Sequence, residues 1–168
     1  MGSSEDIKMA FTWPEGPIPE GLRDLESSLE MMISGATDRI DILTYTQNTD
    51  EEFNLNKSIE HAIKRNKPAV RIFTDNENSA RVMTSRFKGL GSELECWYWN
   101  NAGNEYSKFH IKAILVDDFR VYLGSANLGP TAMEVSAECG AFFRSREVTV
   151  SIRKYLDGLI ERRRLIKY

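Results

Sequence analysis

Four polar residues in the stretch 107–128 have the chemistry needed to hold a phosphate group and attack it. His110 supplies an imidazole, Lys112 an ammonium group, Ser125 a hydroxyl and Asn127 an amide. An imidazole can act as a nucleophile, and the other three groups can offer positive charge or hydrogen bonds to phosphate oxygens. The stretch therefore predicts a site for phosphoryl chemistry, provided that the fold brings the four side chains together.

The same stretch predicts a β-hairpin that would bring them together. Two arms rich in Val, Ile, Leu, Phe and Tyr flank the pair Asp117-Asp118, which is typical of a turn. A turn symmetric about this pair places His110 opposite Ser125. Strand alternation then places Lys112 on the same face as His110.

The order of these residues resembles the HKD signature of the phospholipase D superfamily. The sequence matches it as His110-x-Lys112, four residues, Asp117, six residues, then Gly124-Ser125-x-Asn127. Six fixed positions arise by chance about once in 10⁸ starting points, so coincidence is a weak explanation. Glu138 stands where members of the superfamily commonly carry a downstream acid. The chain most resembles the small, single-motif bacterial nucleases of this superfamily.

The resemblance implies a two-step reaction. His110 would attack phosphorus, expel the first alcohol and form a phosphohistidine that water then cleaves. Lys112, Ser125 and Asn127 would bind the substrate's non-bridging oxygens. Because the site's positive charge comes from Lys112, and no carboxylates cluster at metal-ligand spacing, we predict a metal-independent reaction without a cofactor.

Supporting roles are predicted for three further residues. Glu138 is expected to accept a hydrogen bond from the other ring nitrogen of His110 and so fix its tautomer, unless it is simply a solvated acid at the start of a strand. Asp117 lies in the predicted turn, which favours a structural role. Gly124 is expected to let the backbone turn sharply and leave the serine and asparagine beside the histidine. The second histidine, His61, is interpreted as an exposed helix residue.

A single motif histidine leads to a prediction about assembly. One histidine must attack phosphorus, and an acid must protonate the leaving oxygen, because an unprotonated alkoxide leaves poorly at neutral pH. Superfamily members with two motifs supply two histidines from one chain, so this chain is expected to form a homodimer with a shared active site on the two-fold axis. The alternative is a monomer in which Glu138 or His61 supplies the proton.

Length and composition predict one domain spanning residues 1–168, which the resemblance implies is phospholipase D-like. The chain has 41% hydrophobic and 28% charged residues, which is ordinary globular composition. No apolar run has the length of a membrane helix and no secretion signal is evident, so a cytoplasmic protein without stable membrane insertion is expected. Cys96 and Cys139 are interpreted as buried free thiols of a reducing compartment.

Hydrophobic periodicity predicts alternating strands and helices, and their order resembles the α/β/α sandwich with a mixed central sheet of the phospholipase D superfamily. Strand, helix, strand, helix alternation favours a parallel portion, and the motif hairpin adds an antiparallel one. A closing helix is predicted with Val150, Ile152, Tyr155, Leu156 and Leu159 inward. The predicted strands are 9–13, 39–46, 70–73, 93–99, the two hairpin arms and 135–143, and the predicted helices are 22–33, 55–63, 77–88 and 147–166.

The substrate is predicted to be nucleic acid and the activity a nonspecific endonuclease. Residues 1–60 hold 4 Lys+Arg against 13 Asp+Glu, a balance of −9, whereas residues 61–168 hold 18 against 12, a balance of +6 around the motif. Trp97 and Trp99 could stack bases, although core packing is the commoner role of such residues. The basic residues 162–164 and Lys167 could bind phosphates or simply end a helix. A phospholipase and a non-catalytic phosphate-binding module are the alternatives.

Overall fold

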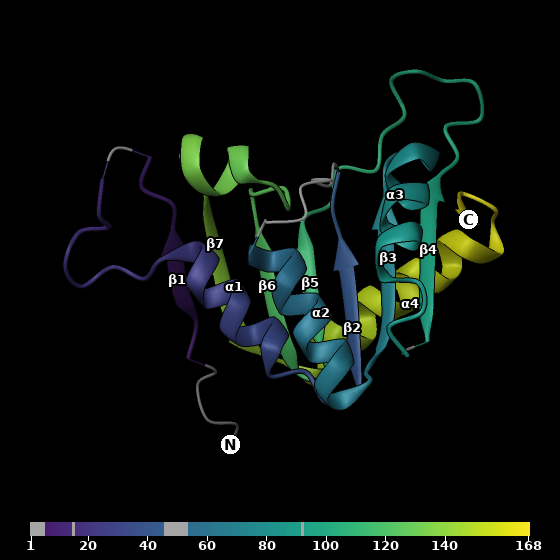
Figure 1. The fold of residues 1–168 in the computed structure, drawn as a ribbon. Coiled ribbons are helices and arrows are strands. Elements are labelled where there is room, and N and C mark those ends of the chain that lie inside the picture. Colours follow the sequence, from purple (N-terminus) through teal and green to yellow (C-terminus); the bar gives the residue numbers. More distant parts are fainter. Residues whose placement is uncertain (1–5, 15, 46–53, 92) are drawn as a thin grey trace.

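The computed structural model describes residues 6–14, 16–45, 54–91 and 93–168. Within them, three helices cover one face of a mixed sheet and one long helix covers the other (Figure 1). This arrangement confirms the predicted α/β/α sandwich. In chain order the elements are β1 (Lys8–Phe11), α1 (Leu25–Ser34), β2 (Arg39–Leu43), α2 (Asn54–Asn66), β3 (Ala69–Thr74), α3 (Glu77–Phe87), β4 (Leu94–Trp99), β5 (Ala113–Val116), β6 (Arg120–Gly124), a π-helical turn (Thr131–Val135), β7 (Cys139–Arg144), α4 (Arg146–Glu161) and β8 (Leu165–Lys167).

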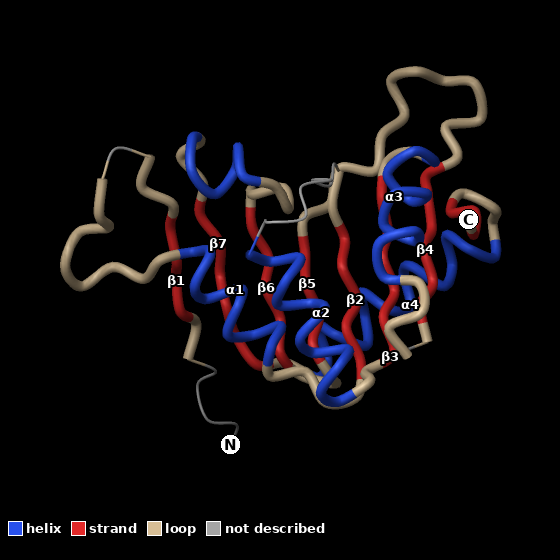
Figure 2. The backbone as a smooth tube through the Cα atoms, in the orientation of Figure 1, coloured by secondary structure: helices blue, strands red, loops and turns tan. Residues whose placement is uncertain are grey.

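The described strands form one sheet in the order β1-β7-β6-β5-β2-β3-β4-β8 (Figure 2). Strands β2, β3 and β4 run parallel, and the remaining neighbours pair antiparallel. The parallel strands are joined by α2 and α3, as βαβ crossovers require. The predicted combination of a parallel portion with an antiparallel hairpin is therefore confirmed.

Two apolar clusters hold the layers together. Leu25, Leu29 and Ile33 recur on the buried face of α1, which is why this segment folds as an amphipathic helix against the sheet. On the opposite face, Leu156 of α4 packs in a smaller cluster with Phe73 of β3 and residues of neighbouring strands. Polar side chains fix where helices begin: Asp24, Asn76 and Ser145 each accept a hydrogen bond from the N–H three residues further on.

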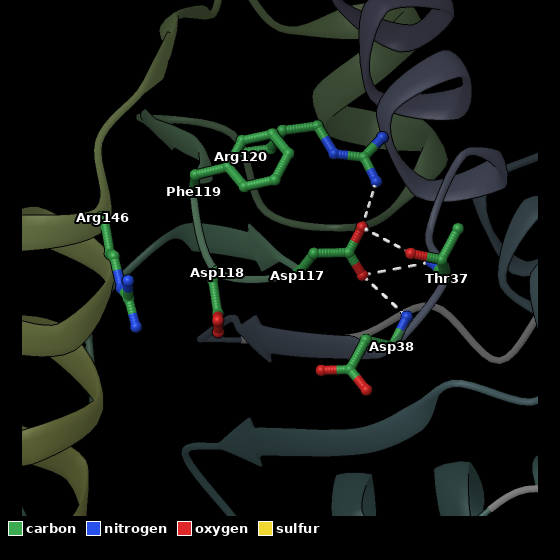
Figure 3. Close-up of a pocket in the computed structure, with 7 residues that line it drawn as sticks. All are labelled: Thr37, Asp38, Asp117, Asp118, Phe119, Arg120 and Arg146. Carbon is green, nitrogen blue, oxygen red and sulfur yellow. Dashed lines mark hydrogen bonds and ion pairs between the residues drawn. The ribbon is translucent and has the colours of Figure 1, made fainter.

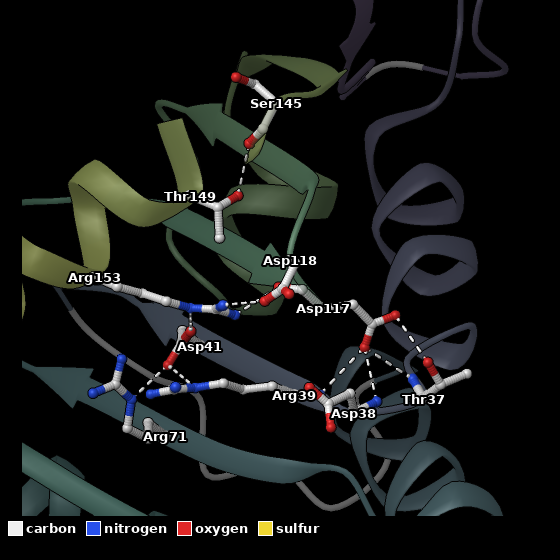
Figure 4. Close-up of polar contacts among 10 residues, drawn as sticks. All are labelled: Thr37, Asp38, Arg39, Asp41, Arg71, Asp117, Asp118, Ser145, Thr149 and Arg153. Atoms are coloured by element: carbon white, nitrogen blue, oxygen red, sulfur yellow. Dashed lines mark hydrogen bonds and ion pairs between the residues drawn. The ribbon is translucent and has the colours of Figure 1, made fainter. Parts of the chain in front are cut away.

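A buried ionic cluster ties α4 to the sheet (Figure 4). Asp41 on β2 is fully buried, and its carboxylate accepts from Arg39 at 3.2 Å, Arg71 at 2.6 Å and Arg153 of α4 at 2.7 Å. Arg153 also donates to Asp118 in the β5–β6 turn at 2.9 Å. Because an unpaired charge in this position would be costly, the cluster fixes how α4 lies on the sheet.

The motif hairpin forms, but its predicted register is wrong by one residue. Val116 pairs with Arg120 and Ile114 with Tyr122, so the turn has three residues instead of two. Its first residue, Asp117, adopts a left-handed backbone conformation with φ of 54°. The Asp117 carboxylate is held by the segment before β2, a long-range contact that local turn preferences do not contain.

The carboxyl end of the chain also differs from expectation. The predicted helix over residues 147–166 ends at Glu161, and Leu165–Lys167 forms β8 beside β4. Val150 and Tyr155 are each 54% exposed, so their predicted inward orientation is wrong. The predicted inward orientation of Ile152, Leu156 and Leu159 is confirmed, and Thr149, two turns before Leu156, is also buried on this stripe.

A second difference precedes β7. The predicted strand over residues 135–143 begins only at Cys139, because Thr131–Val135 forms the π-helical turn. Cys96 is buried as expected, whereas Cys139 is exposed, on a part of the sheet that α4 does not cover. Among the described helices, none combines the length and apolarity needed to cross a bilayer.

Candidate active site

Four motif residues, His110, Lys112, Ser125 and Asn127, gather at one edge of the sheet, where β5 begins and β6 ends (upper edge in Figure 1). His110 and Lys112 lie in the segment that enters β5, and Ser125 directly follows β6. The Gly124 N–H donates to the Lys112 carbonyl at 3.2 Å, which joins the two halves of the motif. Adjacent strands therefore place residues that are 13 to 15 positions apart at one point.

His110 and Lys112 are in direct contact. The Lys112 Nζ lies 2.9 Å from His110 Nε2, and the histidine side chain is exposed at the edge. An ammonium group has only donors, so this contact requires Nε2 to be the acceptor and places the ring proton on Nδ1. His110 Nε2 therefore carries the lone pair and lies beside Lys112, the cation that would bind a phosphate.

Tyr45 completes the surroundings of this pair, and sequence reasoning missed it. Its ring meets the His110 ring edge-on at a centroid distance of 5.0 Å, and Lys112 Nζ lies 5.8 Å from its centroid. Tyr45 follows β2, which pairs with β5 through Leu43 and Ala113. The only signal available was the pairing of strands distant in sequence, which no local pattern reveals.

Lys112 is partly withdrawn from water. Burial lowers the pKa of its ammonium group, and the negative charge of Glu138 opposes that shift. Glu138 is therefore close enough to act on the site electrostatically. A cation with reduced hydration interacts more strongly with a phosphate oxygen than one fully exposed to solvent.

Glu138 contacts Ser125 and, among the described residues, makes no hydrogen bond to His110. The Ser125 hydroxyl donates to the Glu138 carboxylate, which has only acceptors, and accepts from the Cys139 N–H at 3.2 Å. The Ser125 N–H donates to the Cys139 carbonyl at 3.0 Å. The serine hydroxyl proton is thus directed to Glu138 in this structure, and the expected Glu138–His110 contact is absent from it.

Asn127 lies half-buried beyond Ser125. Its side-chain Oδ1 is buried and has no hydrogen-bond partner within the described part of the chain. The next residue is anchored, since the Leu128 N–H donates to the Thr44 hydroxyl at the end of β2 at 3.3 Å. The backbone beside Asn127 is therefore anchored, and the described part of the fold does not use the Asn127 Oδ1.

Gly124 is required for a reason other than the predicted one. Its backbone is not left-handed, and it pairs with Gly140 of β7 inside the sheet. A Cβ at Gly124 would lie 2.2 Å from the Tyr122 hydroxyl oxygen, and one at Gly140 would lie 2.2 Å from the Tyr122 ring. The two glycines make room for the buried tyrosine, so the expectation of a sharp turn at Gly124 is wrong.

Asp117 lies at the other end of β5 from His110, and Figure 3 shows its contacts with Thr37, Asp38 and Arg120. Its carboxylate accepts from the backbone N–H groups of Thr37, Asp38 and Arg39 and from Arg120. Burial alone would raise the pKa of Asp117, but the hydrogen bonds from Asp38, Arg120, Thr37 and Arg39 lower it to about 2. These contacts join the β5–β6 turn to the start of β2.

A hollow of about 550 Å³ lies beside this turn, lined by Asp117, Phe119 and Arg146 among others (Figure 3). It is therefore separated from the motif histidine by the length of β5. His61 is exposed on α2 and lines a different hollow with Glu30 of α1. Neither hollow contains a motif residue other than Asp117.

The two strand tryptophans are already covered by cations. Arg164 lies 4.5 Å from the Trp99 ring centroid, and Lys167 lies 5.7 Å from that of Trp97. Both rings are partly buried against the cluster under α4. Their ring faces serve packing, which leaves them poorly placed to stack bases.

Comparisons with known proteins agree with this geometry. A family model described as "Cardiolipin synthase, PLD-like domain" matches residues 29–160. Nuc from Salmonella typhimurium, a phospholipase D family member, is 18% identical, with a TM-score of 0.72 over 98% of this chain and 99% of its own. NucT from Helicobacter pylori is 22% identical, with a TM-score of 0.69 over 97% and 100%.

A larger protein shares the fold as well. Phosphatidylserine synthase from Haemophilus influenzae is 16% identical, with a TM-score of 0.73 over 100% of this chain and 41% of its own. A comparison with curated protein sequences gave no significant match. At these identities the solved structures establish the fold alone.

Proposed function

We propose that this chain, which belongs to the phospholipase D superfamily of phosphodiesterases, cleaves nucleic acid through a covalent phosphohistidine at His110. The observation that carries the proposal is the contact between His110 Nε2 and Lys112 Nζ at an exposed edge. A nucleophilic nitrogen and a cation for the phosphate are thus presented together where a polymer can reach them.

Two bond exchanges make up the proposed reaction. His110 Nε2 forms a bond to phosphorus as the bond from phosphorus to the first alcohol breaks. Water then attacks phosphorus, the nitrogen–phosphorus bond breaks and His110 is restored. Lys112 and the Asn127 amide hold the non-bridging oxygens throughout, and Glu138 orients Ser125 beside them. The charge comes from side chains, so the proposed reaction needs no metal ion.

Protons must balance in both steps. The leaving alkoxide takes a proton in the first step, and the attacking water loses one in the second. The chain has two histidines, and His61 lies on α2 in a hollow apart from the motif. A second copy's His110 would donate the first proton and accept the second, which supports a homodimer with a shared site.

The surface next to the site supports the same assembly. Leu123 of β6 and Met9 of β1 are 37% and 43% exposed, and both pair with Ala141 of β7 on the sheet face opposite α1. In Figure 1, α4 lies behind the sheet, and its apolar residues pack against residues of β2, β3, β5 and β8. Ser125 is two residues beyond Leu123, so a second copy seated on this apolar face would meet the catalytic edge.

Mixed refolding tests the shared site. Wild-type and His110→Ala chains are unfolded together in varying ratios, refolded and assayed. If only pairs with two histidines turn over, activity follows the square of the wild-type fraction, and an equal mixture retains about a quarter of full activity instead of about half. A linear dependence, or full turnover by a species that sediments as a monomer, would rule out the shared site.

Nucleic acid is favoured over lipid by charge. Residues 61–168 hold 18 Lys+Arg against 12 Asp+Glu, and this part of the chain contains the motif. The family description and the phosphatidylserine synthase likeness make a phospholipid the second candidate. In either case the scissile group is a phosphodiester, so the same site must be tested against both.

A substrate panel in excess EDTA distinguishes them. The purified chain is incubated with single-stranded DNA, duplex DNA, RNA, and vesicles of cardiolipin or phosphatidylcholine, with His110→Ala protein as the contamination control. We expect nucleic acid to be cut in EDTA and affinity to fall steeply with salt. Hydrolysis of lipid without cleavage of nucleic acid would identify a phospholipid as the substrate. Strict dependence on a metal ion would contradict the proposed mechanism.

A further inference from the structure

Residues 106–112, which lead from the β4–β5 loop to the catalytic edge, alternate between solvent and core. Tyr106, Lys108 and His110 are exposed, whereas Phe109 is buried and Ile111 packs against the same cluster under α4. A period of two is that of extended chain, in which alternate side chains project to the same side. Lys108 and His110 therefore project to the same side, and the exposed Tyr106, in the turn over residues 104–107, extends this row of exposed side chains.

The loop that carries Tyr106 is held in shape by its own side chains. Asn100, Asn101 and Asn104 each accept a hydrogen bond at 3.0 Å from the backbone N–H two residues further on. Ser107 is held by two further hydrogen bonds, since its hydroxyl oxygen accepts from Trp99 Nε1 at 3.2 Å and from Arg164 at 2.9 Å. The loop rises above the edge of the sheet that bears the motif (Figure 1).

Tyr106 is the most exposed large apolar residue of the described chain, at 86%. The Trp97 and Trp99 rings carry a Lys167 and an Arg164 cation, whereas the Tyr106 ring has no such contact among the described residues. A ring presented on a preordered loop can stack on a ligand without the cost of ordering the loop. Lys108 is held only loosely, 4.0 Å from Asp75.

We propose that this row is a track for one strand of nucleic acid, which deepens and rests on the proposed function. A base stacks on Tyr106, the neighbouring phosphate meets Lys108, and the scissile phosphate lies at His110. Since extended chain rises about 3.3 Å per residue, Tyr106 lies no more than roughly 13 Å from His110 along the chain. A base inside a duplex has both faces covered by its neighbours, so a stacking platform at this place selects single strands.

Binding measurements test the track. In a His110→Ala background that cannot turn over, affinity for a fluorescent single-stranded oligonucleotide is measured with Tyr106 unchanged or replaced by Ala or Phe. Tyr106→Ala should bind roughly 5- to 150-fold more weakly, and Tyr106→Phe should bind like the parent because it keeps the ring. Lys108→Ala should lower the slope of log affinity against log salt by about 0.7.

Matched controls use residues remote from the row. Tyr168 is 45% exposed and hydrogen-bonded to the middle of β4 through its N–H, and Tyr168→Ala should not change binding. Lys154 is exposed on α4, so Lys154→Ala is the matched control for Lys108→Ala in the salt-dependence measurement. With His110 restored, Tyr106→Ala should hydrolyse bis(p-nitrophenyl) phosphate, which has no base to stack, at the parent rate.

The outcomes separate the track from the proposed function. If the parent neither binds nor cuts nucleic acid, both proposals fail together. If the parent binds and Tyr106→Ala binds equally well, only the track is wrong. If Tyr106→Ala dissociates a dimer and slows hydrolysis of the small ester by the same factor, Tyr106 is an interface residue and the track is again wrong.

Discussion

Replacing His110 by alanine is expected to lower phosphodiester hydrolysis by at least about 10³-fold, because no other group then stands where a bond to phosphorus can form. Lys112 keeps its position beside Tyr45 in this variant, so substrate binding should persist while turnover is lost. The measurement is kcat and KM for a chromogenic phosphodiester, together with binding of an oligonucleotide.

Folding should be almost unchanged by the same substitution. The His110 side chain is exposed and its ring contact is with Tyr45 alone among the described aromatic residues, so the free energy of unfolding should change by no more than about 0.5 kcal/mol. His61→Ala is the matched control, since it removes the other histidine from an exposed position on α2. A folded His110→Ala protein with wild-type turnover would mean that another group is the nucleophile.

Periodicity and apolar runs predicted the elements of this fold because both indicate which residues are buried. The stripe of α1 and the apolar run of β2 reflect burial that is already written in the local sequence. β8 could not be predicted in this way, since its three residues become a strand only by pairing with the edge of β4. Lys167 supports that pairing through its ion pair with Glu95.

The site shows the same division between local and long-range information. The spacing of His110 and Lys112 on one extended segment was enough to predict that they meet. Which residue Glu138 contacts depended on the register of the hairpin. The observed register differs from the predicted one by one residue, and Glu138 contacts Ser125. Tyr45 reaches the site through a β2–β5 pairing of residues 70 positions apart, for which a single sequence carries no signal.

Asp117→Asn is expected to lower the free energy of unfolding at neutral pH by about 2 kcal/mol. The pKa of Asp117 falls from an ordinary 3.8 to about 2 in the folded chain, and a pKa difference of one between the folded and unfolded states corresponds to about 1.4 kcal/mol. Because the folded-state pKa is lowered, this stabilisation is fully present above about pH 4 and is lost as pH falls through about 2. The difference between wild type and Asp117→Asn should therefore shrink in urea unfolding curves taken from pH 7 down to pH 3.

Asp118→Asn is the matched control in the same turn. The Asp118 side chain is 60% exposed, and its ion pair with Arg153 is of the surface kind that contributes about 1 kcal/mol or less. Asp117 is separated from Lys112 by the whole of β5, so Asp117→Asn should keep its turnover per folded molecule. If Asp117→Asn instead lost turnover at unchanged stability, the carboxylate would belong to the chemistry, and the structural role inferred from its contacts with residues 37–39 would be wrong.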